Sequence, residues 1–232
     1  MNYKNFFFTL FLISILILSC SKKEKVTILK EQTLESQMIE LYQEGYNEFL
    51  NGDTRYAAKK FNEAELIFPQ SEWAPAAALM TAYVYYSDDY YSDAIYELER
   101  YLKVYPNHED KVYAHFLLAM CYYENIVDEK RDLAPLLKSK KEFNIVIDFY
   151  PETEFATDAG YKIELINDRL AGKEMYIALH YLKSKKWIPA INRFKNVTEN
   201  YGTTIYVEEA IHRLVETHYI IGLETEAKKY AA

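Results

Sequence analysis

The chain has little of what a disulfide-stabilised or nucleic-acid-binding protein needs. It contains two cysteines in 232 residues, which is too few for a disulfide scaffold. Lysine and arginine number 27 against 35 aspartate and glutamate residues, giving a formal net charge of −8. Because neutralising phosphates requires clustered basic side chains, this acidic balance argues against nucleic-acid binding. Glycine and proline number six each, and we expect nearly all of them at turns between helices.

Catalytic and metal-binding motifs are also missing from the sequence. The five histidines show no ligand spacing on a shared helix face. There is no glycine-rich phosphate loop, no Gly-x-Ser-x-Gly motif and no cysteine paired with a recognisable histidine. The sequence therefore predicts a protein that is not an enzyme and binds no metal.

The first residues resemble the signal peptide of a bacterial lipoprotein. Residues 6–18 contain no charge and no proline, but the run is shorter than the about 20 residues needed to span a hydrocarbon core. It ends in Leu18, Ser19 and Cys20, which resembles a lipobox. We expect residues 1–19 to be removed and Cys20 to carry a covalent lipid; the alternative is an ordinary secretory signal with an incidental cysteine.

The residues after the cysteine indicate where the lipid would anchor the chain. Ser21 follows Cys20, and in lipoproteins of this kind a residue other than aspartate there permits transfer to the outer membrane. Residues 20–35 are polar without a sustained period, so we interpret them as a flexible tether. The prediction is a lipid-anchored protein on the periplasmic face of the outer membrane.

Four sets of residues share one spacing, in which a small residue is followed four places later by a large apolar one and eight places after that by a helix breaker. The sets are Ala57, Phe61 and Pro69; Ala94, Leu98 and Pro106; Ser139, Phe143 and Pro151; and Ala190, Phe194 and Gly202. This spacing is typical of the second half of the 34-residue tetratricopeptide (TPR) repeat. It predicts an all-α solenoid of about five helix-turn-helix repeats in a right-handed superhelix.

The first helix of each repeat should also contain a small residue, twelve places before the small residue of the second helix. Gly45, Ala82 and Ala178 occupy these positions, and Ala119 does so if the third repeat has a longer internal loop. A small residue lets two helices approach closely. A fifth copy starts with Val215 and Ala227 and stops at Ala232, so we expect an incomplete last repeat.

Two interruptions divide the repeats into two groups. A charged loop should cover residues 125–135; its common role is simply to be solvated, and a functional role is the alternative. Residues 154–170 should extend the next helix backwards into a long helix. We thus expect repeats 1–3 in residues 36–153, and the long helix with repeats 4–5 in residues 154–232.

Aromatic residues recur at the first-helix positions that should line the concave face of the superhelix. They are Tyr42, Tyr46, Tyr83, Tyr86, Tyr113, Phe116 and Tyr123. Tyrosine offers wide apolar contact and a hydroxyl for a peptide backbone, which favours a peptide-binding groove. The set lacks the lysine or arginine that a clamp for a free C-terminal carboxylate would need. The alternative is that these rings only pack between helices.

The turn and second helix of the fourth repeat carry a candidate docking surface. Trp187 should anchor the turn, and Asn192 and Arg193 should lie on a face turned away from the groove. Arg193 is either an ordinary surface residue or a salt-bridging contact to another subunit.

These features together resemble the BamD family of outer-membrane β-barrel assembly lipoproteins. The most specific stretch is Asp168, Arg169, Leu170 and Ala171, followed by residues 176–183, residues 187–194 and Tyr201. The resemblance implies a scaffold without catalysis, whose N-terminal repeats receive the C-terminal targeting signal of unfolded barrel proteins. It also implies that the C-terminal repeats, with Arg193, dock on the membrane-proximal POTRA domain of BamA, and that other lipoproteins of the machinery are partners.

The alternative is another periplasmic TPR lipoprotein, such as a pilotin-like factor for a secretin or a protein that coordinates peptidoglycan synthesis. Those proteins share the anchor and the repeats but lack the long connecting helix and the Asp168 to Ala171 stretch.

Overall fold

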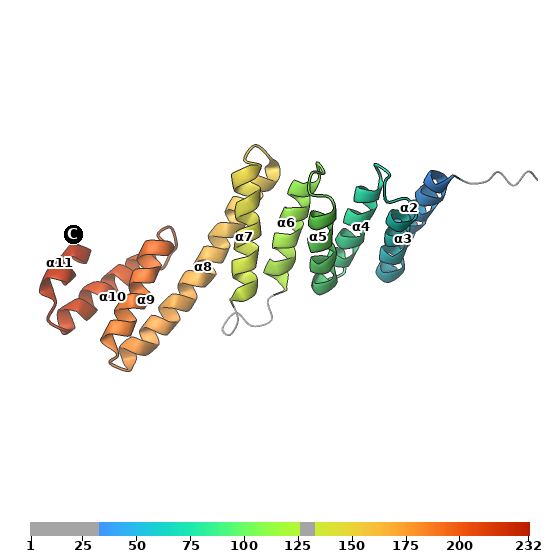
Figure 1. Cartoon of the computed structure of the whole chain (residues 1–232). Helices are drawn as coiled ribbons and strands as arrows, with labels where there is room; N and C mark the ends of the chain where they lie inside the picture. Colours follow the sequence, from blue (N-terminus) through green and yellow to red (C-terminus); the bar gives the residue numbers. More distant parts are fainter. Residues whose placement is uncertain (1–32, 126–132) are drawn as a thin grey trace, which may run out of the picture. The chain divides into compact units, whose positions relative to one another are not determined.

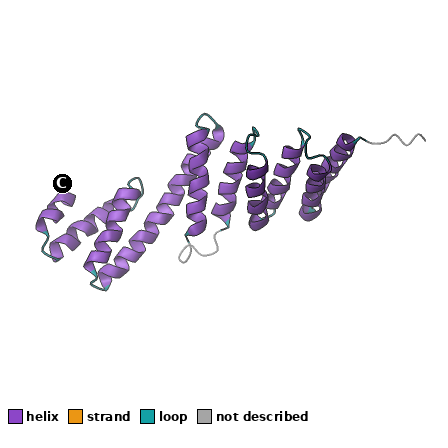
Figure 2. Ribbon diagram, in the orientation of Figure 1, coloured by secondary structure: helices purple, strands orange, loops and turns teal. Residues whose placement is uncertain are grey.

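The computed structural model of the chain describes residues 33–125 and 133–232, and within these ranges it consists of helices without strands (Figures 1 and 2). The helices are α2 (Leu34–Leu50), α3 (Thr54–Ile67), α4 (Ala74–Ser87), α5 (Tyr91–Val104), α6 (Lys111–Glu124), α7 (Ala134–Phe149), α8 (Glu154–Lys183), α9 (Trp187–Asn200), α10 (Val207–Ile220) and α11 (Glu224–Ala231). The predicted all-α class is confirmed.

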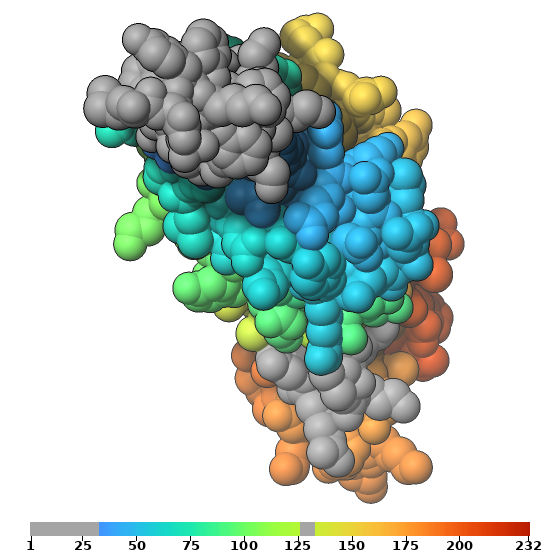
Figure 3. All heavy atoms as spheres, turned by 90° about the vertical axis from the view of Figure 1, so that its right-hand side faces the viewer, coloured from blue at the N-terminus to red at the C-terminus, as the bar shows by residue number. Residues whose placement is uncertain are grey.

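Each helix packs against the next one in the chain, so the helices form the consecutive pairs α2–α3, α4–α5, α6–α7, α8–α9 and α10–α11. Contacts also join the first helices of neighbouring pairs, namely α4 with α6 and α6 with α8. Figure 3 views the stack from the end that carries α2 and α3, with the atoms of these helices in blue. This arrangement of pairs is the predicted TPR repeat.

The small and large positions of the repeat lie where the helices of a pair touch. The side chains of Phe61, Leu98, Phe143 and Phe194 are fully buried, as are those of Ala82, Ala119 and Ala178. At Gly45 even an added Cβ would lie 3.2 Å from the carbonyl oxygen of Ala57. The spacing in the sequence therefore identified the packing contacts correctly.

The turn inside most of these pairs has one backbone conformation. Positive φ angles occur at Gly52, Asp89, Lys185 and Gly222, each seven residues after the small position of its first helix. The backbone N–H of the next residue donates a hydrogen bond to the carbonyl five residues earlier, as Asp53 N–H does to the Glu48 carbonyl. This is a Schellman motif, which satisfies carbonyls at the end of the first helix.

The long helix that the sequence predicts is α8, which runs for 30 residues from Glu154 to Lys183. The Thr153 side chain accepts a hydrogen bond from the Ala156 amide and so caps its start. Most of the charged loop predicted over residues 125–135 lies outside the described residues. Its last two residues were assigned wrongly, since α7 begins at Ala134. Pro135 lies in the first turn of α7, where a missing N–H costs nothing.

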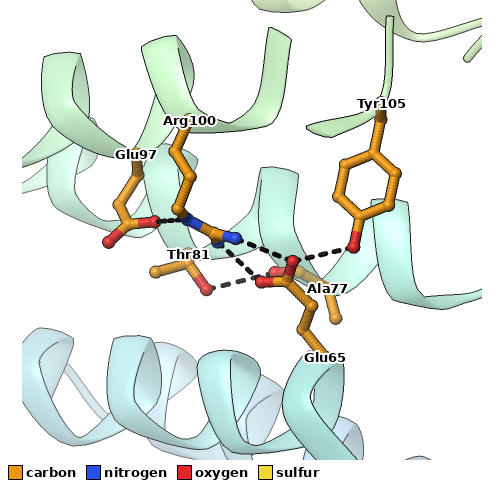
Figure 4. Close-up of polar contacts among 6 residues, drawn as sticks. All are labelled: Glu65, Ala77, Thr81, Glu97, Arg100 and Tyr105. Carbon is orange, nitrogen blue, oxygen red and sulfur yellow. Dashed lines mark hydrogen bonds and ion pairs between the residues drawn. The ribbon is translucent and has the colours of Figure 1, made fainter. Parts of the chain in front are cut away.

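A buried ion pair joins the first two repeats (Figure 4). Arg100 on α5 donates from its two terminal nitrogens to the carboxylate oxygens of Glu65 on α3, at 2.8 and 2.6 Å. Tyr105 donates to the same carboxylate at 2.7 Å, and Glu97 accepts from Arg100 Nε at 2.8 Å. The Glu65 side chain is only 4% exposed, so these hydrogen bonds replace the contacts with water that its carboxylate loses on burial.

The second of the two cysteines, Cys121, is buried and forms no disulfide. Cys121 lies on α6 with no exposed surface, and burial raises the pKa of its thiol to about 12. The predicted signal peptide, Cys20 and most of the tether lie outside the described residues. Among the residues described, none of the helices combines the length and the apolar character needed to span a membrane.

Candidate functional site: a tyrosine cavity and a polar cavity

Three of the predicted groove tyrosines meet around one open cavity. Tyr42 from α2, Tyr83 from α4 and Tyr113 from α6 line a space of about 290 Å³. Ala76, Leu79 and Met80 of α4 add apolar surface to its lining, and Asp110, the residue before α6, completes it. We call this space the tyrosine cavity. The repeat brings these rings together because first helices occupy the same face of successive pairs.

The rings of the tyrosine cavity are held by neighbouring aromatic side chains. Tyr42 lies edge-on to Phe61, with ring centroids 5.0 Å apart, and Tyr83 lies edge-on to Phe49 at 5.9 Å. Burial raises the pKa of Tyr42 and of Tyr113. Both hydroxyls are therefore neutral at physiological pH, so they can donate hydrogen bonds to a ligand.

A second cavity adjoins the first through Tyr42. It has a volume of about 340 Å³ and is lined by Met38, Ile39, Tyr42, Gln43, Trp73 and Ala77. Trp73 is 53% exposed although it is one of the largest apolar side chains. The prediction from sequence missed Trp73, because only first-helix positions were assigned to the groove and this residue lies in the turn before α4. A tryptophan in a turn between two repeats was the sequence feature that could have indicated this part of the groove.

The structure places the other predicted groove residues outside this cavity. Tyr46 is 47% exposed on α2, and Tyr86 contacts Tyr91. Phe116 packs against Phe143 and Phe155, at 5.6 and 5.4 Å between centroids.

Tyr123 lies under two basic side chains of α8. Its ring is 5.1 Å from the Lys162 ammonium and 4.7 Å from the Arg169 guanidinium. Cation–π contacts of this kind tie the end of α6 to the middle of α8. The tyrosine cavity is thus formed by α2, α4 and α6, the first helices of repeats 1 to 3. The ring of Tyr123 joins repeats 3 and 4.

A larger and more polar cavity lies between α8 and α9. Its volume is about 610 Å³, and its lining includes Asn192 and Arg193, which the sequence predicts as docking residues. Glu174, Tyr181, Ile188, Pro189, Lys195, Asn196 and Glu199 complete the lining. We call it the α9 cavity. Trp187, the third predicted docking residue, is half-buried at the first position of α9 and is not among the lining residues.

The Arg193 guanidinium is positioned by a residue that the sequence did not reveal. Arg193 Nη1 lies 3.0 Å from both carboxylate oxygens of Glu174 on α8. The Arg193 side chain remains 42% exposed, whereas Glu174 is 13% exposed. The pair orients the guanidinium at the cavity wall while leaving donors open to a partner. Over residues 33–125 and 133–232, no group of histidine, cysteine, aspartate and glutamate residues could hold a metal ion.

The helix pairs and the small residues buried between them define a TPR-type helical-repeat protein. The family model described as an outer membrane lipoprotein, YfiO, matches residues 34–232. The outer membrane protein assembly factor BamD of Caulobacter vibrioides is 40% identical over 222 residues, which cover 95% of this chain and 72% of the relative. The chain therefore belongs to the BamD family of outer-membrane lipoproteins.

A second curated relative carries the same description. BamD of Rickettsia prowazekii is 40% identical over 192 residues, covering 83% of this chain and 76% of the relative. Among solved structures, a MamA protein has a TM-score of 0.46 and 15% identity, covering 84% of this chain and 87% of that one. The two BamD relatives are named as assembly factors for outer-membrane proteins, so this chain is associated with the outer membrane and with its protein-assembly machinery.

Proposed function

We propose that this protein is a non-catalytic scaffold of the β-barrel assembly machinery with two separate binding surfaces. The tyrosine cavity and its neighbour would bind segments of unfolded outer-membrane proteins, and the α9 cavity would dock on the POTRA domain of the barrel-forming subunit. A lipid on Cys20 would hold the scaffold at the periplasmic face of the outer membrane. The observation that supports the peptide-binding surface is that Tyr42, Tyr83 and Tyr113 line one open cavity.

The shape and chemistry of the groove favour an extended segment. The two cavities are close to the lower end of the range of small-molecule sites, about 300 Å³, so each suits one large side chain. In a strand, alternate side chains point to the same face, which allows successive apolar residues to enter neighbouring cavities. The tyrosine hydroxyls would meet the peptide backbone, whose groups need partners once they leave water.

Removing two of the rings should weaken peptide binding without unfolding the repeats. The double variant Tyr42→Ser with Tyr83→Ser removes two of the three rings of the tyrosine cavity, and Tyr42 also lines the second cavity. We therefore expect affinity for a barrel-strand peptide to fall at least about tenfold. Fluorescence anisotropy with a labelled peptide measures the affinity, and circular dichroism checks the helices. Tyr96→Ser is a control, because Tyr96 is 66% exposed on α5 and lines neither cavity. Equal affinities for the double variant and the wild type would contradict the proposed groove.

The α9 cavity supports a docking role through its mixture of charge and apolar surface. Ile188 is 58% exposed next to the Arg193–Glu174 pair. Exposed apolar side chains beside an oriented arginine are typical of protein interfaces. A folded partner that offers a carboxylate to Arg193 and an apolar residue to Ile188 would suit this surface.

A further inference from the structure

The turn between α8 and α9 concentrates positive charge on an acidic protein. Residues 175–198 contain no aspartate or glutamate, although the chain as a whole has 35 acidic residues against 27 lysines and arginines. Lys183 is the last residue of α8, and Lys185 and Lys186 follow it before α9 begins at Trp187. All three lysines are exposed. We call Lys183, Lys185 and Lys186 the lysine turn.

No acidic side chain neutralises the lysine turn. Among the residues that the structure describes, no ion pair involves any of the three lysines. Lys185 has a φ of 57°, and the Lys186 N–H donates to the Tyr181 carbonyl at 2.9 Å. The backbone therefore holds the three charges at one end of the α8–α9 pair, and such a cluster attracts an anionic partner.

Trp187 adds a second property of a surface that faces a membrane. It is the first residue of α9, directly after the lysines, and it is half-buried. Tryptophan is enriched at the interface between membrane and water, where its ring lies at the level of the headgroups. A lysine beside it keeps its ammonium in water while its aliphatic stem covers apolar surface. Neither Trp187 nor the lysine turn lines the α9 cavity, so this surface is distinct from that cavity.

Lysine suits a bilayer surface better than a protein partner that offers carboxylates. Its ammonium is a compact charge that needs no bidentate geometry, and the phosphates of a bilayer present no fixed pattern. The chain belongs to a family of outer-membrane lipoproteins, so a bilayer is the anionic surface closest to its place of work. Each lysine at an anionic membrane increases affinity about fivefold, so the three together increase it about a hundredfold.

We infer that the lysine turn, together with Trp187, binds the anionic phospholipid headgroups of the bilayer. The contact would determine which end of the α8–α9 pair faces the membrane, which an acyl chain on Cys20 does not specify. It would be a third surface besides the tyrosine cavity and the α9 cavity. The inference rests on the proposed function only in holding the protein at a membrane.

Tryptophan quenching tests the contact on the full-length lipoprotein reconstituted into vesicles. The chain contains two tryptophans, so Trp73→Phe leaves Trp187 as the only one. Brominated phosphatidylcholine quenches a tryptophan that reaches the membrane surface. We expect Trp187 emission to fall at least about twofold when the vesicles also contain phosphatidylglycerol. Vesicles of brominated phosphatidylcholine alone, or high salt, should leave the emission nearly unchanged, because the attraction is electrostatic and is screened.

A variant without the three charges should lose this quenching. Its substitutions are Lys183→Gln, Lys185→Asn and Lys186→Gln, with asparagine at 185 because asparagine tolerates a positive φ. A matched control removes the same number of charges from exposed lysines of the second helices; its substitutions are Lys59→Gln, Lys103→Gln and Lys141→Gln. The control should keep the quenching, and circular dichroism checks that both variants fold.

Three outcomes would overturn the inference. The first is quenching that persists in the variant of the lysine turn, and the second is no quenching of Trp187 in anionic vesicles. The third is a variant of the lysine turn that loses a POTRA-bearing subunit on co-isolation while Trp187 does not respond to lipid, because the lysines would then bind a protein. Flotation of the protein with the vesicles reports the lipid anchor separately, so a failure of the anchor is distinguished from a failure of the lysine turn.

Discussion

Replacing Arg100 with methionine is expected to lower the free energy of unfolding by about 3 kcal/mol, because it leaves the buried Glu65 carboxylate without its cation. Two guanidinium nitrogens hold that carboxylate at 2.8 and 2.6 Å. The hydrogen bonds to Glu65, together with Glu97, raise the pKa of Arg100 above its ordinary value. Urea denaturation followed by circular dichroism measures the loss.

A double variant separates the ion pair from the packing of its side chains. Glu65→Leu with Arg100→Met should be much less destabilised than Arg100→Met alone, since no buried charge is left unpaired. Arg213→Met is the control, because Arg213 pairs on the surface with Glu209 and Glu216 and such pairs contribute little. If Arg100→Met and Arg213→Met lose the same stability, the buried pair does not hold the first two repeats together.

Phe143→Ala should cost about 4 kcal/mol, because it opens a cavity in the middle of the stack. The Phe143 ring is fully buried and packs 5.6 Å from Phe116. In a repeat protein each pair depends on its neighbours, so this loss should uncouple α6 and α7 from α8. Hydrogen exchange should show protection falling first in these helices.

Phe149→Ala on the same helix is a closely matched control, because that ring is 73% exposed. The same atoms are deleted, yet we expect little change in the free energy of unfolding. A comparable loss for Phe143→Ala and Phe149→Ala would mean that the repeat spacing does not mark the core.

The fold could be predicted from the sequence because each repeat position has a simple packing demand. A small residue is needed at the closest approach of two helices, as at Ala82, and a large one is needed four places on, as at Leu98 after Ala94. Both demands leave a visible period in the sequence. The long helix α8 was predictable for the same reason, since its apolar residues keep the helical period without a breaker.

Features that depend on side-chain partners from distant repeats could not be predicted in the same way. The Glu65–Arg100 pair joins residues 35 positions apart, and nothing local distinguishes them from the many solvated charges of the chain. Asp89 and Lys185 adopt positive φ without being glycine, because the Schellman geometry of the turn overrides their preference. Trp73 was missed because the groove was assigned from first-helix positions alone.

The measurement that tests the two-surface scaffold most directly is co-isolation of the lipoprotein with a POTRA-bearing barrel subunit from outer membranes. We expect Ile188→Glu and Arg193→Glu to reduce the recovered subunit strongly, because both change the wall of the α9 cavity. Ile220→Glu should recover it fully; both isoleucines are 58% exposed, but Ile220 lies on α10 outside the cavity. Undiminished recovery with Ile188→Glu and Arg193→Glu, or recovery of a secretin in place of the POTRA-bearing barrel, would contradict the account.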